Sequence, residues 1–271
     1  MITSFQQAVL DHGIIAICRG LSGEKLLRLS DVLYEAGIRF IEVTYNHSDP
    51  DTLQHTGEAI SQLVQRHSDL HIGAGTVLTQ AEVFNTQKHG GTFIVSPNTN
   101  LDVIRCAKAA GMGSVPGAMT PSEIVDAYDA GADVVKLFPA DQLGPAYIKA
   151  IRSPLNHIPL LATGGVDLAN FESFLKAGCC GAGLGGSLTN KKMLAEEDWA
   201  GLAEQRGGHN RGRNSIPKEL GQAFCDLYLC DRELPVSDCW RFTKEWAINN
   251  RPELLADMPS ERTFRRYAET I

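Results

Sequence analysis

The chain has 271 residues, of which 43% are hydrophobic and 21% are charged, and its formal net charge is −7. This length allows one large α/β domain, or one domain with a small appendage, and the composition is that of an ordinary globular protein. No apolar run approaches the length of about twenty residues that spans a membrane, and residues 1–5 have no signal-peptide pattern, so we expect a cytoplasmic protein.

Eight short apolar runs alternate with helix-like amphipathic segments between Ile14 and Leu184. The runs are 14–17, 40–43, 70–74, 93–95, 113–115, 134–137, 159–162 and 181–184, and helices are expected over 24–36, 80–89, 101–110, 121–130 and 168–177. A glycine suited to a helix C-cap follows each of these helices, at Gly37, Gly90, Gly111, Gly131 and Gly178. Eight strand–helix repeats predict parallel strands joined by crossover helices, in a (β/α)₈ TIM barrel.

A doubly wound open α/β sheet is the alternative fold. That fold would place a G-x-G-x-x-G phosphate fingerprint after the first strand, and Cys18-Arg19-Gly20-Leu21-Ser22 lacks it. The seven cysteines form no Cys-x-x-Cys pair, so we expect reduced, structural thiols and no zinc site.

Lys136 lies inside the apolar run Val134-Val135-Lys136-Leu137. Burial disfavours an ammonium ion and lowers its pKa, and the neutral amine that results can attack a carbonyl carbon. The alternative is that Lys136 ends the strand and extends its amine to solvent.

Polar and small residues gather where the predicted strands end, which in a barrel is the end that holds the chemistry. They are Arg19; Glu42, Thr44 and Asn46; Thr76; Ser96, Pro97 and Asn98; Pro116 and Gly117; Lys136; Thr163, Gly164 and Gly165; and Gly185, Gly186 and Ser187. Each has a structural alternative: Glu42 could be an ion-pair partner, and Thr76 or Ser96 could cap a helix.

A neutral lysine beside a carboxyl group suits Schiff-base chemistry, in which protons move to and from the substrate oxygen. Glu42 is the best-placed carboxyl group, and a protonated imine is an electron sink that allows the neighbouring C–C bond to break. The residues therefore predict an aldol cleavage without a metal or another cofactor. His47, Asp49 and Asp51 have no metal-ligand spacing and are expected to lie solvated in a loop.

The loops after the seventh and eighth strands of a barrel are a frequent phosphate site. Gly164 and Gly165, with Gly185, Gly186 and Ser187, supply backbone N–H groups to which an anion can come close, although these glycines could also serve only tight turns. Arg19 could hold a substrate carboxylate or lie free on the surface. Phe138 could shield the imine from water or only pack beside the strand.

These residues resemble the class I 2-keto-3-deoxy-6-phosphogluconate (KDPG) aldolases and their 6-phosphogalactonate (KDPGal) relatives. The similarity spans residues 5–199 and rests on the stretches 41–44, 73–78, 96–98, 115–117, 135–139 and 163–166. It implies that Lys136 forms the Schiff base and Glu42 shuttles protons in a barrel, usually trimeric, that releases pyruvate and D-glyceraldehyde 3-phosphate. The substrate-binding residues would be Arg19, Thr76, Pro97, Phe138, Thr163, Gly164, Gly165, Gly185, Gly186 and Ser187.

Several positions distinguish the branches of this family. The 6-phosphogluconate branch has an arginine four residues after the catalytic glutamate, where this chain has Asn46, as the 6-phosphogalactonate branch does. Arg19-Gly20 also resembles the 6-phosphogalactonate branch, whereas Thr44 and Thr163 resemble the other. We therefore expect 2-dehydro-3-deoxy-6-phosphogalactonate as the substrate, with the gluconate epimer as the alternative.

The residues after the barrel have a different pattern. We predict a barrel over 1–205 whose closing helix, starting near 195, is truncated, then a glycine- and arginine-rich linker over 206–215 and a small all-α segment over 216–271. Stretches 222–229 and 259–266 resemble part of the DNA-binding region of Mu-type phage transposases, and 260–266 could be the recognition helix of a helix-turn-helix-like unit. With 11 basic and 10 acidic residues, 206–271 has a net charge of only +1, which does not favour DNA binding.

Three other interpretations stay open. The tail could be an unrelated helical appendage, the protein could be a DNA-binding fusion with an inert barrel, or the barrel could bind a phosphorylated ligand without turnover. No membrane partner is expected, and the expected partners are a small phosphosugar acid and further copies of the chain.

Overall fold

The computed structural model describes residues 3–167, 169–189, 194, 198–199 and 243–244. The chain divides into two compact units, Met1–Arg206 and Gly207–Ile271. The predicted linker over 206–215, the helical segment over 216–271 and the closing helix near 195 lie outside the described residues, apart from the few positions just given.

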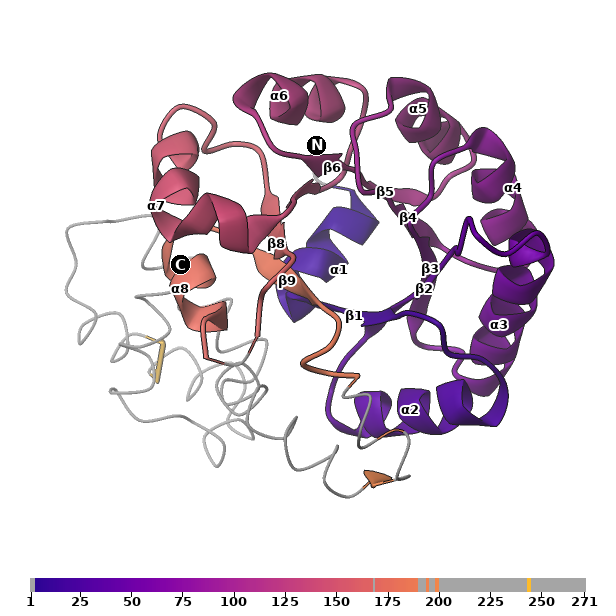
Figure 1. Ribbon diagram of the computed structural model, residues 1–271. Helices are drawn as coiled ribbons and strands as arrows, with labels where there is room; N and C mark the ends of the chain where they lie inside the picture. Colours follow the sequence, from indigo (N-terminus) through magenta and orange to yellow (C-terminus); the bar gives the residue numbers. More distant parts are fainter. Residues whose placement is uncertain (1–2, 168, 190–193, 195–197, 200–242, 245–271) are drawn as a thin grey trace. The chain divides into compact units, whose positions relative to one another are not determined.

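Strands and helices alternate through the first unit (Figure 1). The strands are β1 (Ile14–Cys18), β2 (Phe40–Thr44), β3 (His71–Gly75), β4 (Phe93–Val95), β5 (Gly113–Val115), β6 (Gly117–Ala118), β7 (Val135–Leu137), β8 (Leu160–Thr163) and β9 (Gly181–Leu184). The helices are α1 (Ser4–His12), α2 (Gly23–Glu35), α3 (Thr52–Arg66), α4 (Gln80–Lys88), α5 (Leu101–Ala109), α6 (Pro121–Asp129), α7 (Ala140–Arg152) and α8 (Phe171–Lys176).

The strands form one parallel sheet in the order β5-β4-β3-β2-β1-β9-β8-β7-β6. β5 and β6 are separated only by Pro116, whose nitrogen carries no hydrogen and cannot continue a ladder. The carbonyl of Pro116 nevertheless accepts a hydrogen bond from the Lys136 N–H at 2.8 Å, and that of Ser114 accepts one from the Asp133 N–H at 3.0 Å. β5 and β6 are thus two halves of one barrel strand, the ring closes, and the predicted (β/α)₈ barrel is confirmed.

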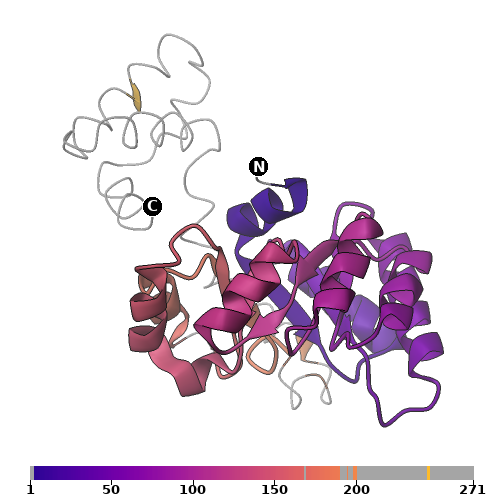
Figure 2. The ribbon, with the colours of Figure 1, turned by 90° about the horizontal axis from the view of Figure 1, so that it is seen from above.

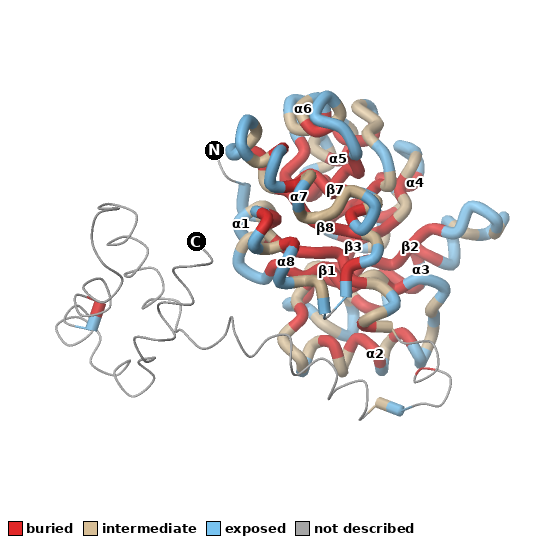
Figure 3. The backbone as a smooth tube through the Cα atoms, turned by 60° about the vertical axis from the view of Figure 1, so that its left-hand side comes forward, coloured by how far each residue is buried: buried red, intermediate tan, exposed pale blue. Residues whose placement is uncertain are grey.

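The helices bury one face against the outside of the barrel (Figure 3). In α2, Leu26, Leu29 and Leu33 recur at helical spacing, and all three are fully buried in the cluster between strands and helices. Each such leucine stabilises the fold by about 2 kcal/mol. The five glycines predicted to follow helices all have positive φ, as a helix C-cap requires.

Helix α1 was not among the predicted helices, and it covers one end of the barrel (Figures 1 and 2). Phe5 of α1 contacts the rings of Phe40 and Phe93, at centroid distances of 5.7 and 5.5 Å. These rings belong to a cluster inside the barrel that also holds Val9 and Val134. The amino-terminal end of the barrel is therefore filled with apolar side chains.

Two other helices, α3 and α7, were also absent from the predicted set, and α8 begins later than predicted. Residue 168 was expected to start α8, but the helix starts at Phe171. Asp167 and Asn170 form a turn before it, in which each backbone N–H donates to the other side chain at 2.9 and 3.1 Å. None of the helices that the structure describes is both long and apolar enough to cross a membrane.

Candidate active site

Glu42 and Lys136 project into the barrel because of strand periodicity. Side chains two residues apart in a strand lie on the same face. Phe40, on β2, and Val134, just before β7, both belong to the interior cluster, so Glu42 and Lys136 face the interior one layer nearer the carboxyl ends of the strands. The structure thus places both side chains on the inner face of one barrel.

Both groups are buried, with 3% of Glu42 and 7% of Lys136 exposed. Burial raises the pKa of Glu42 to about 7, and the positive charges of Lys136 and Arg19 act in the opposite direction. Burial also lowers the pKa of Lys136; the charge of Glu42 opposes this shift and that of Arg19 adds to it. A carboxyl group that keeps its proton near neutrality thus faces an amine that loses its proton more readily than usual.

Neither group is held by a structural partner. Within the part of the chain that the structure describes, the Glu42 carboxyl and the Lys136 amine form no hydrogen bond and no close ion pair with other side chains. Glu42 therefore has no structural ion-pair partner of the kind that the alternative interpretation requires. Both groups keep their hydrogen-bonding capacity for a ligand.

Small residues make room around these groups. A Cβ atom at Gly75 would collide with Oε1 of Glu42 and lie 2.9 Å from its Cδ. A Cβ at Gly183 would lie 2.7 Å from Oγ1 of Thr163, and one at Gly117 would collide with the Pro97 carbonyl. The sequence analysis did not single out Gly75, although the alternation of His71, Gly73 and Gly75 marks the inner face of β3.

Phe138 and Arg19 both act on the Lys136 amine. The Lys136 Nζ atom lies 4.7 Å from the centroid of the Phe138 ring, in a cation–π arrangement. Phe138 remains 36% exposed, so it covers the amine without closing the site. Arg19 is exposed after β1, yet its charge lowers the pKa of both Glu42 and Lys136.

The glycine segments predicted to bind phosphate lie after neighbouring strands, because β8 pairs with β9. Within the described residues, the backbone N–H groups of Gly164, Gly165, Gly186 and Ser187 donate no hydrogen bond. Ser187 Oγ is buried without a partner, and so is Thr163 Oγ1 at the end of β8. Buried polar groups in this state are rare, and these two adjoin the glycine segments whose N–H groups are open.

Thr76 and Pro97 follow β3 and β4 at the same end of the barrel. Neither Thr76 nor Ser96 caps a helix: Thr79 caps α4 and Asn100 caps α5. Thr76 has φ 59°, a left-handed conformation that costs a residue other than glycine about 1 kcal/mol. Strain of this kind is concentrated at ligand sites.

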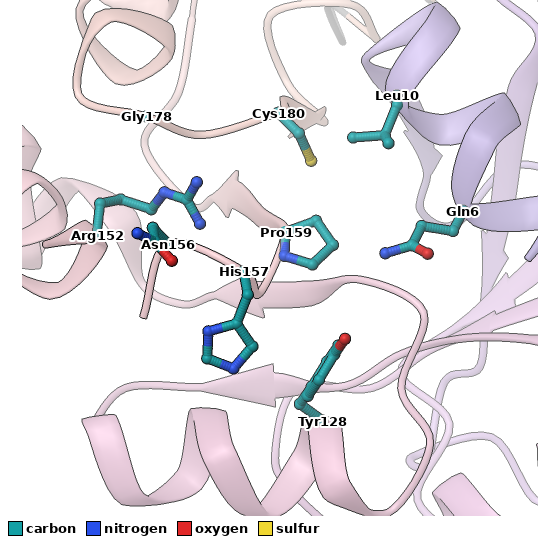
Figure 4. Close-up of a pocket in the computed structure, with 9 residues that line it drawn as sticks. All are labelled: Gln6, Leu10, Tyr128, Arg152, Asn156, His157, Pro159, Gly178 and Cys180. Carbon is teal, nitrogen blue, oxygen red and sulfur yellow. The ribbon is translucent and has the colours of Figure 1, made fainter. Parts of the chain in front are cut away.

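No group of His, Cys, Asp and Glu suited to a metal ion occurs within the ranges that the structure describes. A pocket of about 390 Å³ lies at the amino-terminal end of β8 and β9, between α1 and the ends of α6 and α7 (Figure 4). Its walls include Arg152, His157 and Cys180, and it is at the opposite end of the barrel from Lys136. The residues that line this pocket include no lysine and no carboxylate, so we assign the site to the mouth with Lys136 and Glu42.

A closed (β/α)₈ barrel with a buried lysine and an up-shifted carboxyl group inside it is the arrangement of a lysine-dependent aldolase. The chain matches the family described as "KDPG and KHG aldolase" over residues 6–204, and it belongs to that family. It is a class I aldolase, a carbon–carbon lyase.

Named relatives are similar over most of their length. The chain is 39% identical over 187 residues to a probable 2-dehydro-3-deoxy-6-phosphogalactonate aldolase of Rhizobium meliloti, covering 69% of this chain and 86% of that protein. It is 37% identical over 177 residues to the 2-dehydro-3-deoxy-6-phosphogalactonate aldolase of Escherichia coli, covering 65% and 83%. The solved structure described as native KDPGal superposes with a TM-score of 0.64 at 34% identity, covering 72% of this chain and 90% of that one.

Proposed function

We propose that this protein is a Schiff-base aldolase that cleaves 2-dehydro-3-deoxy-6-phosphogalactonate to pyruvate and D-glyceraldehyde 3-phosphate. The observation that carries the proposal is the placement of Lys136 and Glu42 inside one barrel, where burial raises the pKa of Glu42 to about 7 and lowers that of Lys136. The two relatives named above act, by their names, on this substrate. The 2-keto-3-deoxy-6-phosphogluconate epimer is the alternative substrate, and Thr44 and Thr163 favour it.

The reaction starts with the neutral Nζ of Lys136, which attacks the C2 ketone while the acid form of Glu42 gives a proton to the carbonyl oxygen. Loss of water from the resulting carbinolamine leaves a protonated imine. Glu42, now a carboxylate, takes the proton of the C4 hydroxyl, the C3–C4 bond breaks, and its electron pair flows into the imine to give an enamine. Glu42 returns the proton to C3, and water releases pyruvate and frees the amine.

The remaining site residues bind the substrate in this proposal. Arg19 holds the carboxylate next to the ketone, and Phe138 shields the imine from water. The open N–H groups of Gly164, Gly165, Gly186 and Ser187 take the phosphate, together with Gly185. The left-handed turn at Thr76 and the segments at Pro97 and Thr163 shape the middle of the site.

Kinetic comparison of the two C4 epimers tests the substrate. We expect a kcat/KM at least about tenfold higher for the galactonate epimer, a difference of about 1.4 kcal/mol in transition-state stabilisation. Equal values would contradict the substrate choice, and a preference for the gluconate epimer would establish the alternative. Trapping with borohydride and pyruvate, followed by peptide mass spectrometry, should place a stable adduct on Lys136.

For the whole protein we propose a homotrimer, as the family resemblance implies, and the cytoplasmic location stays a prediction. A sedimentation measurement on the full chain would decide the oligomeric state.

For residues 206–271 we propose a linker followed by a helical segment fused to the barrel. If the segment binds DNA, as its resemblance to Mu-type transposases suggests, the full chain should be retained on DNA at low salt and released as salt rises; no retention at low salt would end that part of the proposal.

A further inference from the structure

Residues 46–51 form the loop that follows β2 and Tyr45, and the His47 side chain joins this loop to the start of α4. Tyr45, just before the loop, has its own contacts with α4: its hydroxyl donates to the Glu82 carbonyl at 3.1 Å and lies 3.0 Å from Thr86 Oγ1. His47 Nε2 lies 2.7 Å from Oε1 of Glu82. The other oxygen of that carboxylate, Oε2, accepts hydrogen bonds from the N–H groups of Leu78 at 2.6 Å and Thr79 at 2.9 Å. One carboxylate therefore connects the segment that follows Glu42 to the segment that follows Thr76.

The environment of the pair makes the contact strong. The Glu82 side chain is 6% exposed, whereas the His47 side chain is 39% exposed. Hydrogen bonds to a carboxylate are stronger than those between neutral groups, and burial of the acceptor strengthens them further. His47 is exposed, as expected of a loop residue, and its ring also reaches back to a buried partner.

The loop has contacts with itself and with His55 of α3 that do not depend on His47. Asp49 Oδ2 lies 2.7 Å from His55 Nδ1, and its Oδ1 accepts a hydrogen bond from the Asp51 N–H at 3.0 Å. The Asn46 side chain accepts one from the Ser48 N–H at 3.2 Å. Removing the imidazole of His47 should therefore release residues 46–51 from α4 without unfolding the loop itself, while Tyr45 keeps its hydrogen bonds to α4.

We propose that His47 is a positioning residue for the aldolase reaction. Acting through Glu82, it holds the loop of residues 46–51 against the turn after Thr76 at the mouth of the barrel. It thereby sets the affinity for the hydroxylated, phosphorylated part of the sugar acid, which extends outward from Lys136. This inference rests on the proposed function, because it assigns the loop to that substrate.

The test compares four proteins: the wild type, His47→Leu, His47→Gln and His55→Leu. We expect His47→Leu to raise KM for the phosphosugar acid about tenfold and to change kcat less than about twofold, because the reacting groups stay in place. His47→Gln retains an N–H donor and should restore most of the affinity. His55→Leu is the matched control: it removes a histidine–carboxylate contact of the same 2.7 Å length from the same loop but leaves the link to α4, so KM should stay within about twofold of the wild type.

Two further measurements separate this inference from the proposed function. Borohydride trapping with pyruvate should be as fast in His47→Leu as in the wild type, because pyruvate does not extend to the loop. Hydrogen exchange should be faster over residues 46–52 in His47→Leu and unchanged in His47→Gln. An unchanged KM and exchange in His47→Leu, in a wild type that cleaves the substrate, would overturn the positioning role. A wild type that cleaves neither epimer would instead overturn the proposed function, and with it the role assigned to the loop.

Discussion

Glu42 and Lys136 stand on opposite sides of the barrel. In the strand order, β2 and β7 are four steps apart in one direction, through β1, β9 and β8, and four in the other, when β5 and β6 are taken as one strand. Across the interior, each charge still acts on the pKa of the other group. A substrate placed between them can meet the amine and the acid from two sides, which suits an addition at one face of a ketone and a proton transfer at its oxygen.

Replacing Lys136 by methionine removes the nucleophile and keeps the length of the side chain. We expect no measurable cleavage and no borohydride adduct with pyruvate, because Lys136 is the one buried lysine among the residues that the structure describes. Lys149→Ala, on the exposed face of α7, is the control and should retain wild-type rates. Turnover by Lys136→Met would refute the Schiff-base mechanism.

Replacing Glu42 by glutamine should slow kcat by about 10²- to 10⁴-fold, the range for loss of a general acid–base. It should also change how stability depends on pH. Because the pKa of Glu42 is raised from 4.5 to about 7, ionising this group destabilises the folded state. The penalty is absent below about pH 4.5, grows up to about pH 7, and is complete above it, where it is on the order of 3 kcal/mol.

Glutamine cannot ionise, so Glu42→Gln should be more stable than the wild type at pH 8 and of similar stability at pH 4.5. Urea denaturation at the two pH values measures the difference. A stability gap that does not widen as pH rises would show that Glu42 is not held as a neutral acid.

Adding a methyl group at Gly75 should displace the Glu42 carboxyl, since the new Cβ would occupy the position of Oε1. We expect Gly75→Ala to lower kcat by more than about tenfold while Lys136 still forms an adduct with pyruvate, although more slowly. Gly57→Ala on α3 is the control, because its Cβ would meet the His89 ring at 2.6 Å, outside the barrel mouth. Equal losses of activity in both variants would mean that general destabilisation, and not the carboxyl position, explains the effect.

Asp133 anchors α1 at the closed end of the barrel. Its side chain is 1% exposed, and its two carboxylate oxygens lie 2.7 and 2.8 Å from the Lys108 amine. The carboxylate also accepts hydrogen bonds from Thr3 Oγ1 at 2.6 Å and from the Ser114 N–H at 2.8 Å. Asp133→Ala leaves these donors without their acceptor and should reduce the free energy of unfolding by about 3 kcal/mol. Asp129→Ala, which is exposed, should change it by less than about 0.5 kcal/mol. Chemical denaturation would check both values, and a cost below 1 kcal/mol for Asp133→Ala would show that the network adds little.

Much of the fold could be predicted because its signals are local. Each strand of the barrel is a short apolar run, and the five predicted C-cap glycines have the backbone conformation expected from their place after helices. Helix α1 has no strand before it to complete a repeat, and its role depends on contacts with Phe40 and Phe93, which are distant in the sequence. Pro116 explains why the fifth strand is divided into β5 and β6. The ring still closes at this point because the backbone N–H groups of Asp133 and Lys136 donate hydrogen bonds across it.

The site was predictable in its residues and less so in its geometry. Lys136 was conspicuous as a charge in an apolar strand, and alternation along β2 fixes the direction of Glu42. Nothing in the sequence shows that β2 and β7 stand opposite each other, because this depends on how the ring closes. The contact of His47 with Glu82 joins a loop to a helix across 35 positions of the sequence, and no periodic pattern indicates it.

The apolar filling at the closed end of the barrel determines the order in which products depart. The interior on one side of Lys136 is filled by Phe5, Phe40, Phe93 and Val134. Within the described unit, a molecule joined to the Lys136 amine can therefore leave only through the mouth of the barrel. The three-carbon aldehyde phosphate lies on the outward side of the broken bond and leaves first, while pyruvate, still attached, leaves last. Added pyruvate should therefore compete with the sugar acid for the free enzyme, whereas added aldehyde phosphate should act on the form that already holds pyruvate and drive the reaction back toward condensation.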